Sequence, residues 1–215
     1  MFNSLENMED LFNDINDLKK SEIKKLVDNR INEFDKVKSK THNKLFEELC
    51  FCIMTANCSA DKCIEVQELI GDGFLHLSEE KLAHALKLYG YRFPNIRAKY
   101  IAQARQFSDE LKSNIKTHKD PHKLREWIVN NIKGLGYKEA SHFLRNIGFT
   151  DYAIIDFHIL DLLERFGLIK KPRSLTKSKY LEIEESLRKI AETLNLNLAE
   201  LDLYMWYMET GKILK

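Results

Sequence analysis

The sequence predicts an all-α protein. Its 215 residues include only 8 Gly and 3 Pro, and no stretch shows the sustained alternation of apolar and polar residues that marks a β-strand. Apolar residues recur instead at helical spacing, as Leu45, Phe46, Leu49 and Ile53 do. The composition is 44% hydrophobic and 31% charged, so a chain of this length buries a sizeable core without a metal or a disulfide.

Capping signals divide the chain into about ten helices joined by short polar connections. The expected helix starts lie near Leu5, Ser21, Thr41, Ser59, Ser78, Phe93, Asp120, Tyr137, Asp156, Thr176 and Asn197. Asp120-Pro121 combines an N-cap residue with proline at the first helical position, and Asn197 with Glu200 forms a variant of the capping box. Glycines mark the expected stops, at Gly71, Gly90, Gly148, Gly167 and Gly211.

Four cysteines lie within fourteen residues, at Cys50, Cys52, Cys58 and Cys63. They are too close together to cross-link distant parts of the chain, so we expect reduced thiols. A zinc module would need them as ligands, but Cys50 and Cys52 lie in an apolar helical pattern and no Cys-x-x-Cys knuckle is present. We therefore expect buried thiols and no bound metal.

The formal net charge is +1, but the charge is unevenly distributed. Residues 111–147 carry eight basic residues against three acidic ones, which gives this segment a charge of +5. The basic residues are Lys112, Lys116, Lys119, Lys123, Arg125, Lys133, Lys138 and Arg145. Such a segment attracts a polyanion, although a solvated helix face has the same composition.

No stretch approaches the roughly 20 uncharged apolar residues that span a bilayer. The first residues, Met1 to Glu6, also lack a cationic end followed by an apolar run. We therefore expect an intracellular protein of the cytoplasm or nucleoid that is neither secreted nor bound to a membrane.

Two glycines bracket one apolar residue in Gly134-Leu135-Gly136, between two helical patterns. The glycines allow a tight turn with positive backbone angles, Leu135 fills the angle between the helices, and exposed N–H groups can bind a phosphate. This is a helix-hairpin-helix pattern, and we expect Lys133 and residues 134–136 to contact a DNA backbone. Glycines also join helix pairs that bind nothing, so the turn alone leaves both interpretations open.

A lysine and an aspartate follow this turn. Lys138 lies just inside the second helix of the pair, and Asp156 comes eighteen residues later among apolar residues. Burying a carboxylate among apolar residues costs free energy unless hydrogen bonds or a functional role compensate for it. Asp156 caps the following helix in one interpretation and faces a cleft in the other, and the two are compatible.

The order of hairpin, lysine, short gap and Asp-x-His-Ile resembles the helix-hairpin-helix DNA glycosylase superfamily, specifically its bifunctional glycosylase/lyase members. Further segments extend the resemblance to the type 2 8-oxoguanine DNA glycosylase/AP lyase found largely in archaea. These segments are Leu49 to Asn57, Gly90 to Phe93, Gly136 to Asn146 and Leu201 to Tyr204. The resemblance covers the chain from about residue 20 to its end.

The resemblance implies two helical subdomains that flank an active-site cleft. Residues 42–155 would form the subdomain that contains the helix-hairpin-helix, and residues 1–41 with residues 156–215 would form the second. Lys138 and Asp156 are expected to face each other across the cleft. We expect a monomer whose partner is double-stranded DNA containing 8-oxoguanine or abasic sites.

The implied activity is excision of 8-oxoguanine, followed by nicking of the strand at the abasic site by β-elimination through a lysine Schiff base. Lys138 is the expected nucleophile, because a primary amine attacks C1′ of the sugar and stays attached as an imine. The positive end of the helix dipole disfavours its ammonium form. Asp156 is expected to stabilise the positive charge that develops on the sugar. We expect no cofactor.

A base flipped out of the duplex needs stacking partners and contacts to its edges. The resemblance implies that Phe93 and Trp206 sandwich the base. It also implies that the carboxylate of the terminal Lys215 accepts a hydrogen bond from N7–H, which 8-oxoguanine has and guanine lacks. Asp202 is a further candidate for a contact to the Watson–Crick edge. His158 is interpreted as a structural residue, and Trp127 is expected in the core because it lies on the apolar face with Leu124 and Ile128.

The sequence differs from many members of this family at Phe157, and it differs from a related branch in lacking that branch's cysteine loop. Phe157 stands where many relatives have a polar or basic residue, so one contact to the DNA backbone could be missing. The endonuclease-like branch ends in an iron–sulfur loop, but no cysteine follows Cys63. Two alternatives stay open: a non-catalytic helix-hairpin-helix DNA-binding module, and a glycosylase for oxidised pyrimidines.

Overall fold

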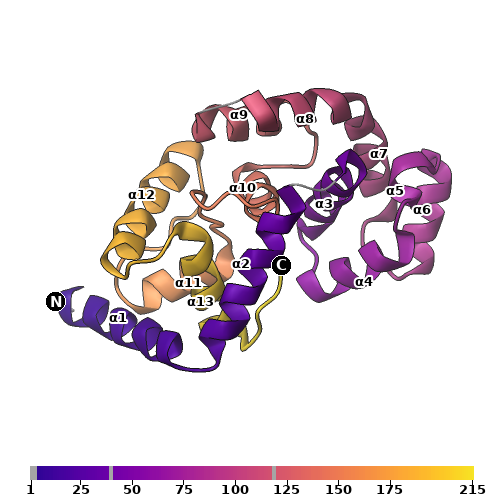
Figure 1. Cartoon of the computed structure of the whole chain (residues 1–215). Helices are drawn as coiled ribbons and strands as arrows, with labels where there is room; N and C mark the ends of the chain where they lie inside the picture. The colour runs from indigo at the N-terminus through magenta and orange to yellow at the C-terminus, as the bar shows by residue number, and fades with distance from the viewer. Residues whose placement is uncertain (1–3, 39–40, 118–119) are drawn as a thin grey trace. The chain divides into compact units, whose positions relative to one another are not determined.

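The structure is a computed structural model that describes residues 4–38, 41–117 and 120–215. Thirteen α-helices and one 3-10 helix are the regular elements in these ranges (Figure 1), and most connections between them are short, apart from residues 147–156 and 166–176. The predicted all-α class is confirmed. None of the helices within the described ranges is long and apolar enough to cross a membrane. Two expectations partly concern residues outside these ranges. The expectation that the protein is not secreted used Met1 to Asn3, and the charge of residues 111–147 includes Lys119.

The chain divides into two compact units. The central unit is Asp35–Gly148, and the terminal unit combines Met1–Phe34 with Phe149–Lys215. Helix α2 (Ile23–Lys38) runs through the first junction. The division expected from the sequence lies seven residues further along at each junction, at 41/42 against 34/35 and at 155/156 against 148/149.

The central unit is built around α3, whose residues from Leu45 to Thr55 are all buried. A helix that is buried on every side forms the centre of its layer, and α4, α5, α7, α8 and α10 pack against α3. The helices of this unit are α3 (His42–Thr55), α4 (Ala60–Ile70), α5 (Gly73–His76), α6 (Glu79–Leu88), α7 (Pro94–Ala104), η1 (Arg105–Phe107), α8 (Ser108–Thr117), α9 (Pro121–Asn131) and α10 (Tyr137–Asn146).

The terminal unit has α13 at its centre. Seven of the first eight residues of α13, from Leu198 to Met205, are buried, and α1, α11 and α12 pack against this helix. The extended segment from Tyr152 to Ile155 is also buried. The helices of this unit, besides the first part of α2, are α1 (Ser4–Lys20), α11 (Phe157–Arg165), α12 (Lys177–Thr193) and α13 (Leu198–Thr210).

The capping signals located the helix starts well. All eleven expected starts lie within two residues of an observed helix start. Six N-cap side chains accept a hydrogen bond from the first turn of their helix: Ser59, Ser78, Asp120, Asp156, Thr176 and Asn197. The five glycines expected to stop helices all have positive φ, which an L-residue with a side chain adopts only under strain.

Three helical elements, α5, η1 and α8, had no expected start. Helix α5 has only four residues, and the helical path after Ala104 tightens into η1 before α8 begins. Contacts with distant residues hold these elements in place: Arg105 Nε donates to the carbonyl of Phe74 at 2.9 Å, and His42 Nε2 lies 2.6 Å from Ser108 Oγ. Because these contacts join residues far apart in the chain, no capping signal in the sequence predicts the elements that they hold in place.

The central position of α3 makes a prediction about stability. Leu49 is 0% exposed, so Leu49→Ala leaves a cavity in the core and should lower the free energy of unfolding by about 2 to 5 kcal/mol. Leu88→Ala is the control, because Leu88 is 69% exposed and its truncation should cost less than about 0.5 kcal/mol. Urea unfolding measures both values, and equal losses would contradict a core centred on α3.

Candidate active site

The turn between α9 and α10 is the predicted helix-hairpin-helix. Gly134 has φ +89°, and a Cβ at this position would lie 2.5 Å from Cδ2 of Tyr100. Leu135 is buried beneath the turn, as expected. The expectation of a positive angle at both glycines was wrong for Gly136, which is extended at φ −92°. Gly134 alone therefore makes the turn.

Two amides of the turn already have partners inside the protein. The N–H of Leu135 donates to the carbonyl of Ile132 at 3.3 Å, and the N–H of Gly136 donates to Glu139 Oε2 at 3.2 Å. A phosphate at Gly136 would have to replace the carboxylate of Glu139. Lys133 is exposed at the tip of the turn, where it can reach a phosphate.

Helix α10 is held from two sides by buried polar groups. The guanidinium of Arg125 on α9 donates to Ser141 Oγ at 3.1 Å and lies 5.0 Å from the ring of Tyr137. At the other end of α10, Asn146 Nδ2 donates to Glu48 Oε1 of α3 at 2.7 Å. These contacts set the position of the helix that carries Lys138.

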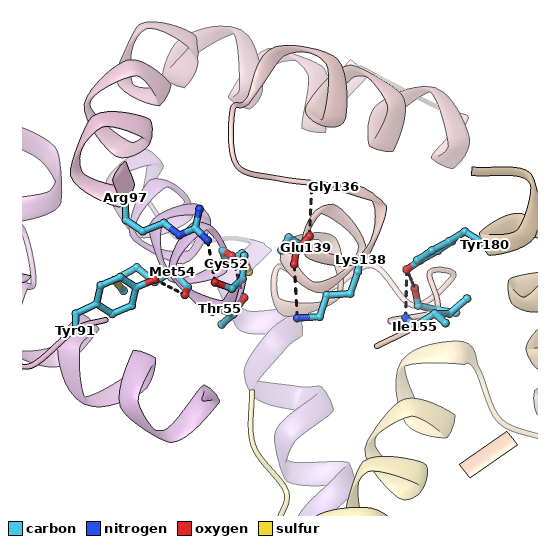
Figure 2. A network of polar contacts seen from close by, with 12 residues as sticks. Cys52, Met54, Thr55, Tyr91, Arg97, Gly136, Lys138, Glu139, Ile155 and Tyr180 are labelled. Atoms are coloured by element: carbon cyan, nitrogen blue, oxygen red, sulfur yellow. Dashed lines mark hydrogen bonds and ion pairs between the residues drawn. The ribbon is translucent and has the colours of Figure 1, made fainter. Parts of the chain in front are cut away.

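Lys138 is the second residue of α10, as predicted, and its side chain is 23% exposed. Its Nζ lies 3.9 Å from Glu139 Oε1 (Figure 2). The thiol of Cys63 on α4 is within electrostatic range of Lys138, and burial raises the pKa of this thiol well above its usual value. The Cys63 thiol is therefore neutral at physiological pH.

The carbonyl groups at the C-terminal end of α3 accept hydrogen bonds from the side chains of Tyr91 and Arg97. Tyr91 donates through its hydroxyl to the carbonyl of Met54 at 2.6 Å (Figure 2). Arg97 Nη2 donates to the carbonyl of Ala56 at 2.8 Å. These bonds satisfy carbonyls that the helix end leaves open. Burial raises the pKa of the Tyr91 hydroxyl, so it remains a donor across the physiological pH range.

Asp156 is the N-cap of α11 in the terminal unit. Its Oδ1 accepts from the amide of Ile159 at 3.0 Å, which confirms the capping interpretation. The extended segment before it is fastened by α12. Tyr180 donates through its hydroxyl to the carbonyl of Ala153 at 2.6 Å and accepts from the amide of Ile155 at 3.3 Å, and Glu184 Oε2 accepts from the amide of Ala153 at 3.0 Å.

Three ring side chains contact one another between the start of α11 and α13. Phe157 is 61% exposed and its ring lies 3.9 Å from that of His158, which in turn makes an edge contact with Trp206 at 4.9 Å. His158 thus packs between the two rings. Trp206 is half-buried, and its Nε1 has no hydrogen-bond partner among the described residues.

The other residues expected at the base pocket lie as follows. Phe93, in the central unit, is the half-buried N-cap of α7, with the guanidinium of Arg92 4.9 Å from its ring. Asp202 is buried one turn before Trp206 and lines a small cavity with Ile159 and Leu187. Lys215 is half-buried at the end of the chain. Contacts of these residues with a base stay predictions.

Two expectations about surface and core need correction. Arg125 and Arg145 were counted with the basic residues that would attract a polyanion, but both are buried and hydrogen-bonded inside the central unit. Among the described members of this set, Lys116, Lys123 and Lys133 are exposed. Trp127 is half-buried rather than in the core, because its Nε1 donates to Glu110 at 3.1 Å.

The four cysteines are free thiols, with Cys50, Cys52 and Cys63 buried and Cys58 half-buried. Within the part of the chain that the structure describes, no group of three or more His, Cys, Asp or Glu side chains is arranged to hold a metal ion. The residues that sequence reasoning missed are Arg125, Glu139, Tyr180 and Glu184. Only Glu139 had a local signal, because it stands at the third helical position after a turn.

Comparison with known proteins agrees with this geometry. Residues 27–196 match the family model described as 8-oxoguanine DNA glycosylase. The chain is 52% identical to the 8-oxoguanine DNA glycosylase/AP lyase of Methanocaldococcus jannaschii over 95% of its length and 99% of the relative, and 49% identical to that of Korarchaeum cryptofilum over 97% and 99%. The crystal structure of the M. jannaschii glycosylase/lyase in complex with a 15mer DNA containing 8-oxoguanine matches with a TM-score of 0.93 and 51% identity, over 95% of this chain and 99% of that one.

The turn makes a prediction that separates backbone strain from steric fit. Gly211 has φ +68° and open space around it, so Gly211→Ala should cost only the left-handed backbone penalty of about 1 to 2 kcal/mol. Gly134→Ala adds the clash with Tyr100 and should cost about 1 to 3 kcal/mol more. Urea unfolding measures the difference, and equal losses would show that the Tyr100 ring moves aside freely.

Proposed function

The chain belongs to the 8-oxoguanine DNA glycosylase family, and we propose that it excises 8-oxoguanine from double-stranded DNA and then cleaves the strand at the abasic site. The observation that carries this proposal is the identity of about half of all residues with glycosylase/lyases over nearly the whole chain. The activity takes place where DNA is kept, in the cytoplasm or nucleoid.

Lys138 is the nucleophile in this proposal. Its Nζ forms a bond to C1′ of the damaged nucleotide while the bond from C1′ to the base breaks, and the base leaves with a proton. The sugar ring then opens as the C1′–O4′ bond breaks and O4′ takes up a proton, which turns the adduct into an imine. This imine makes a C2′ proton acidic. Its removal breaks the C3′–O bond by β-elimination, and water then releases the lysine. The position of Lys138 in the first turn of α10, next to the hairpin, supports this role.

Asp156 stabilises the positive charge that develops on the sugar as the bond to the base breaks. One oxygen of its carboxylate is held by the Ile159 amide, and the segment before it is fastened by Tyr180 and Glu184. A carboxylate that is fixed in this way does not need to reorganise during the reaction. Asp156 belongs to the terminal unit and Lys138 to the central unit, so their action on one nucleotide is a prediction of the proposal.

Trapping with borohydride tests the proposal. Lys138→Gln should abolish the covalent adduct with 8-oxoguanine DNA and the strand cleavage, while binding to the duplex stays within about threefold, because a single phosphate contact is a small part of the total. Asp156→Asn should slow base removal by orders of magnitude without unfolding α11, because asparagine is an equally good N-cap.

Lys189→Gln is the matched control, because Lys189 is exposed on α12 and should be trapped like the parent protein. Parental adduct formation by Lys138→Gln would show that another amine reacts. A parent protein that binds damaged DNA but gives no adduct would instead support the non-catalytic binding module.

The end of the chain makes a separate prediction. Gly211 ends α13 in the left-handed conformation, and four residues follow it. Deleting Lys215 moves the terminal carboxylate and should reduce discrimination between 8-oxoguanine and guanine by about 1 to 3 kcal/mol, because N7–H loses its acceptor. Cleavage of an abasic site, which needs no base pocket, should persist.

Lys215→Ala is the informative companion, because it keeps the carboxylate at the same place and removes only the side chain. Single-turnover rates on 8-oxoguanine DNA and abasic DNA measure both variants. Equal loss on the two substrates after the deletion would show that the tail supports folding rather than recognition.

A further inference from the structure

Two of the four cysteines occupy positions that the start of a helix brings together. Ser59 is the N-cap of α4, and its hydroxyl accepts from the amide of Lys62 at 3.4 Å. Cys58 is the residue before this cap, and Cys63 is the fourth residue of the helix. Residues at these two positions pack against each other in the hydrophobic staple, a recurrent arrangement at helix starts. The geometry of α4 therefore favours contact between the two thiols.

The structure shows this contact. The side chains of Cys58 and Cys63 are joined by a hydrogen bond, and both residues are free thiols. Backbone hydrogen bonds hold each of them: the amide of Cys58 donates to the carbonyl of Thr55 at 3.3 Å, and the amide of Cys63 donates to the carbonyl of Ser59 at 3.1 Å. The backbone on both sides of the cap is thus fixed, and the two sulfur atoms stay within reach of each other.

The two thiols differ in their access to solvent. Cys58 is half-buried, whereas Cys63 is 0% exposed. Burial raises the pKa of the Cys63 thiol, and the neighbouring Cys58 raises it further. A thiol reacts with oxidants through its thiolate, which is disfavoured at Cys63. Cys58 is therefore the sulfur that meets a small oxidant from solvent first, with Cys63 next to it.

The other two cysteines provide an internal comparison. Cys50 and Cys52 are both 0% exposed and lie two residues apart on α3. Side chains at this spacing on a helix do not face each other. This pair therefore has neither the contact nor the access to solvent that Cys58 and Cys63 combine.

We propose that Cys58 and Cys63 are an oxidation site at which hydrogen peroxide converts the two thiols into an intramolecular disulfide. The Cys58 sulfur bonds to one oxygen of the peroxide as the O–O bond breaks, and its proton leaves with the other oxygen as water. The Cys63 sulfur then bonds to the Cys58 sulfur as the S–O bond breaks, and the Cys63 proton leaves with the hydroxyl group as a second water. Two electrons pass from the thiols to the peroxide, and a thiol reductant reverses the change.

Cys63 is the resolving thiol in this proposal. A sulfenic acid that meets no second thiol is oxidised further to a sulfinic acid, which a thiol reductant does not restore. The sulfinic acid would place a negative charge beside Cys63, which has Arg97 and Lys138 within its electrostatic range, whereas the disulfide is neutral. The pair thus protects this part of the central unit from irreversible oxidation. The inference does not depend on the proposed function.

The test exposes the reduced full chain to hydrogen peroxide, removes the oxidant and counts the thiols after denaturation. The count should fall from four to two, and the mass of the chain should fall by about 2 Da. Trypsin cleaves after Lys62, between the two cysteines, so only a disulfide keeps their peptides joined. Dithiothreitol should restore the four thiols, and Cys50 and Cys52 should remain thiols throughout.

Two variants separate the roles of the two sulfur atoms. Cys58→Ser should keep its remaining thiols reduced, because Cys63 is buried and has lost its partner. Cys63→Ala leaves Cys58 without a resolving thiol, so dimedone should trap a sulfenic acid at Cys58, and longer exposure should add about 32 Da as a sulfinic acid. Thermal unfolding before oxidation checks that both variants are folded, and the peptide map of the parent protein does not rely on them.

Three results would overturn the inference. A folded parent protein that keeps four thiols, under conditions that oxidise the same chain unfolded in urea, would show that the two sulfur atoms do not meet. A dimer linked through Cys58 on a non-reducing gel would show that the disulfide forms between chains. A peptide map that joins Cys58 to Cys50 or Cys52 would assign the resolving thiol to α3.

Discussion

Arg125 carries a positive charge into the interior of the central unit, where it is fully buried. Burying a guanidinium costs several kcal/mol unless nearby groups satisfy it. Its partners Tyr137 and Ser141 both belong to α10, whereas Arg125 belongs to α9. The two helices therefore cannot slide along each other without leaving a buried charge unsatisfied, and the place of Lys138, the residue after Tyr137, depends on this contact.

Much of the fold was predictable because helix starts are local events. A side chain that caps a helix accepts a hydrogen bond from an amide two or three residues away. Asp156 and Asn197 therefore predict the starts of their helices from the local sequence alone. The same locality identified the hairpin from Gly134 and placed Lys138 in the first turn of the second helix. The all-α class followed from these signals, whereas the family was predicted from the resemblance of several motifs to a known family.

The rest depended on contacts between residues far apart in the chain. Nothing near Arg125 indicates that it is buried, because its partners lie twelve and sixteen residues later. The fastening of the segment before Asp156 comes from Tyr180 and Glu184, more than twenty residues away. A charge count from the sequence treats every basic residue as exposed. Only the packed structure shows that some of them, such as Arg125, are buried in the core.

The order of the two units along the chain has a consequence for biosynthesis. The terminal unit is assembled from both ends of the chain, and the whole central unit is inserted between its halves. A ribosome therefore completes the hairpin and Lys138 before it has made Asp156 and α13. The central unit has all its helices available for folding during translation, whereas α1 must wait for a partner helix that is synthesised nearly two hundred residues later. Lys138, the proposed nucleophile, is thus made eighteen residues before Asp156, and the terminal unit is complete only when the last helix emerges.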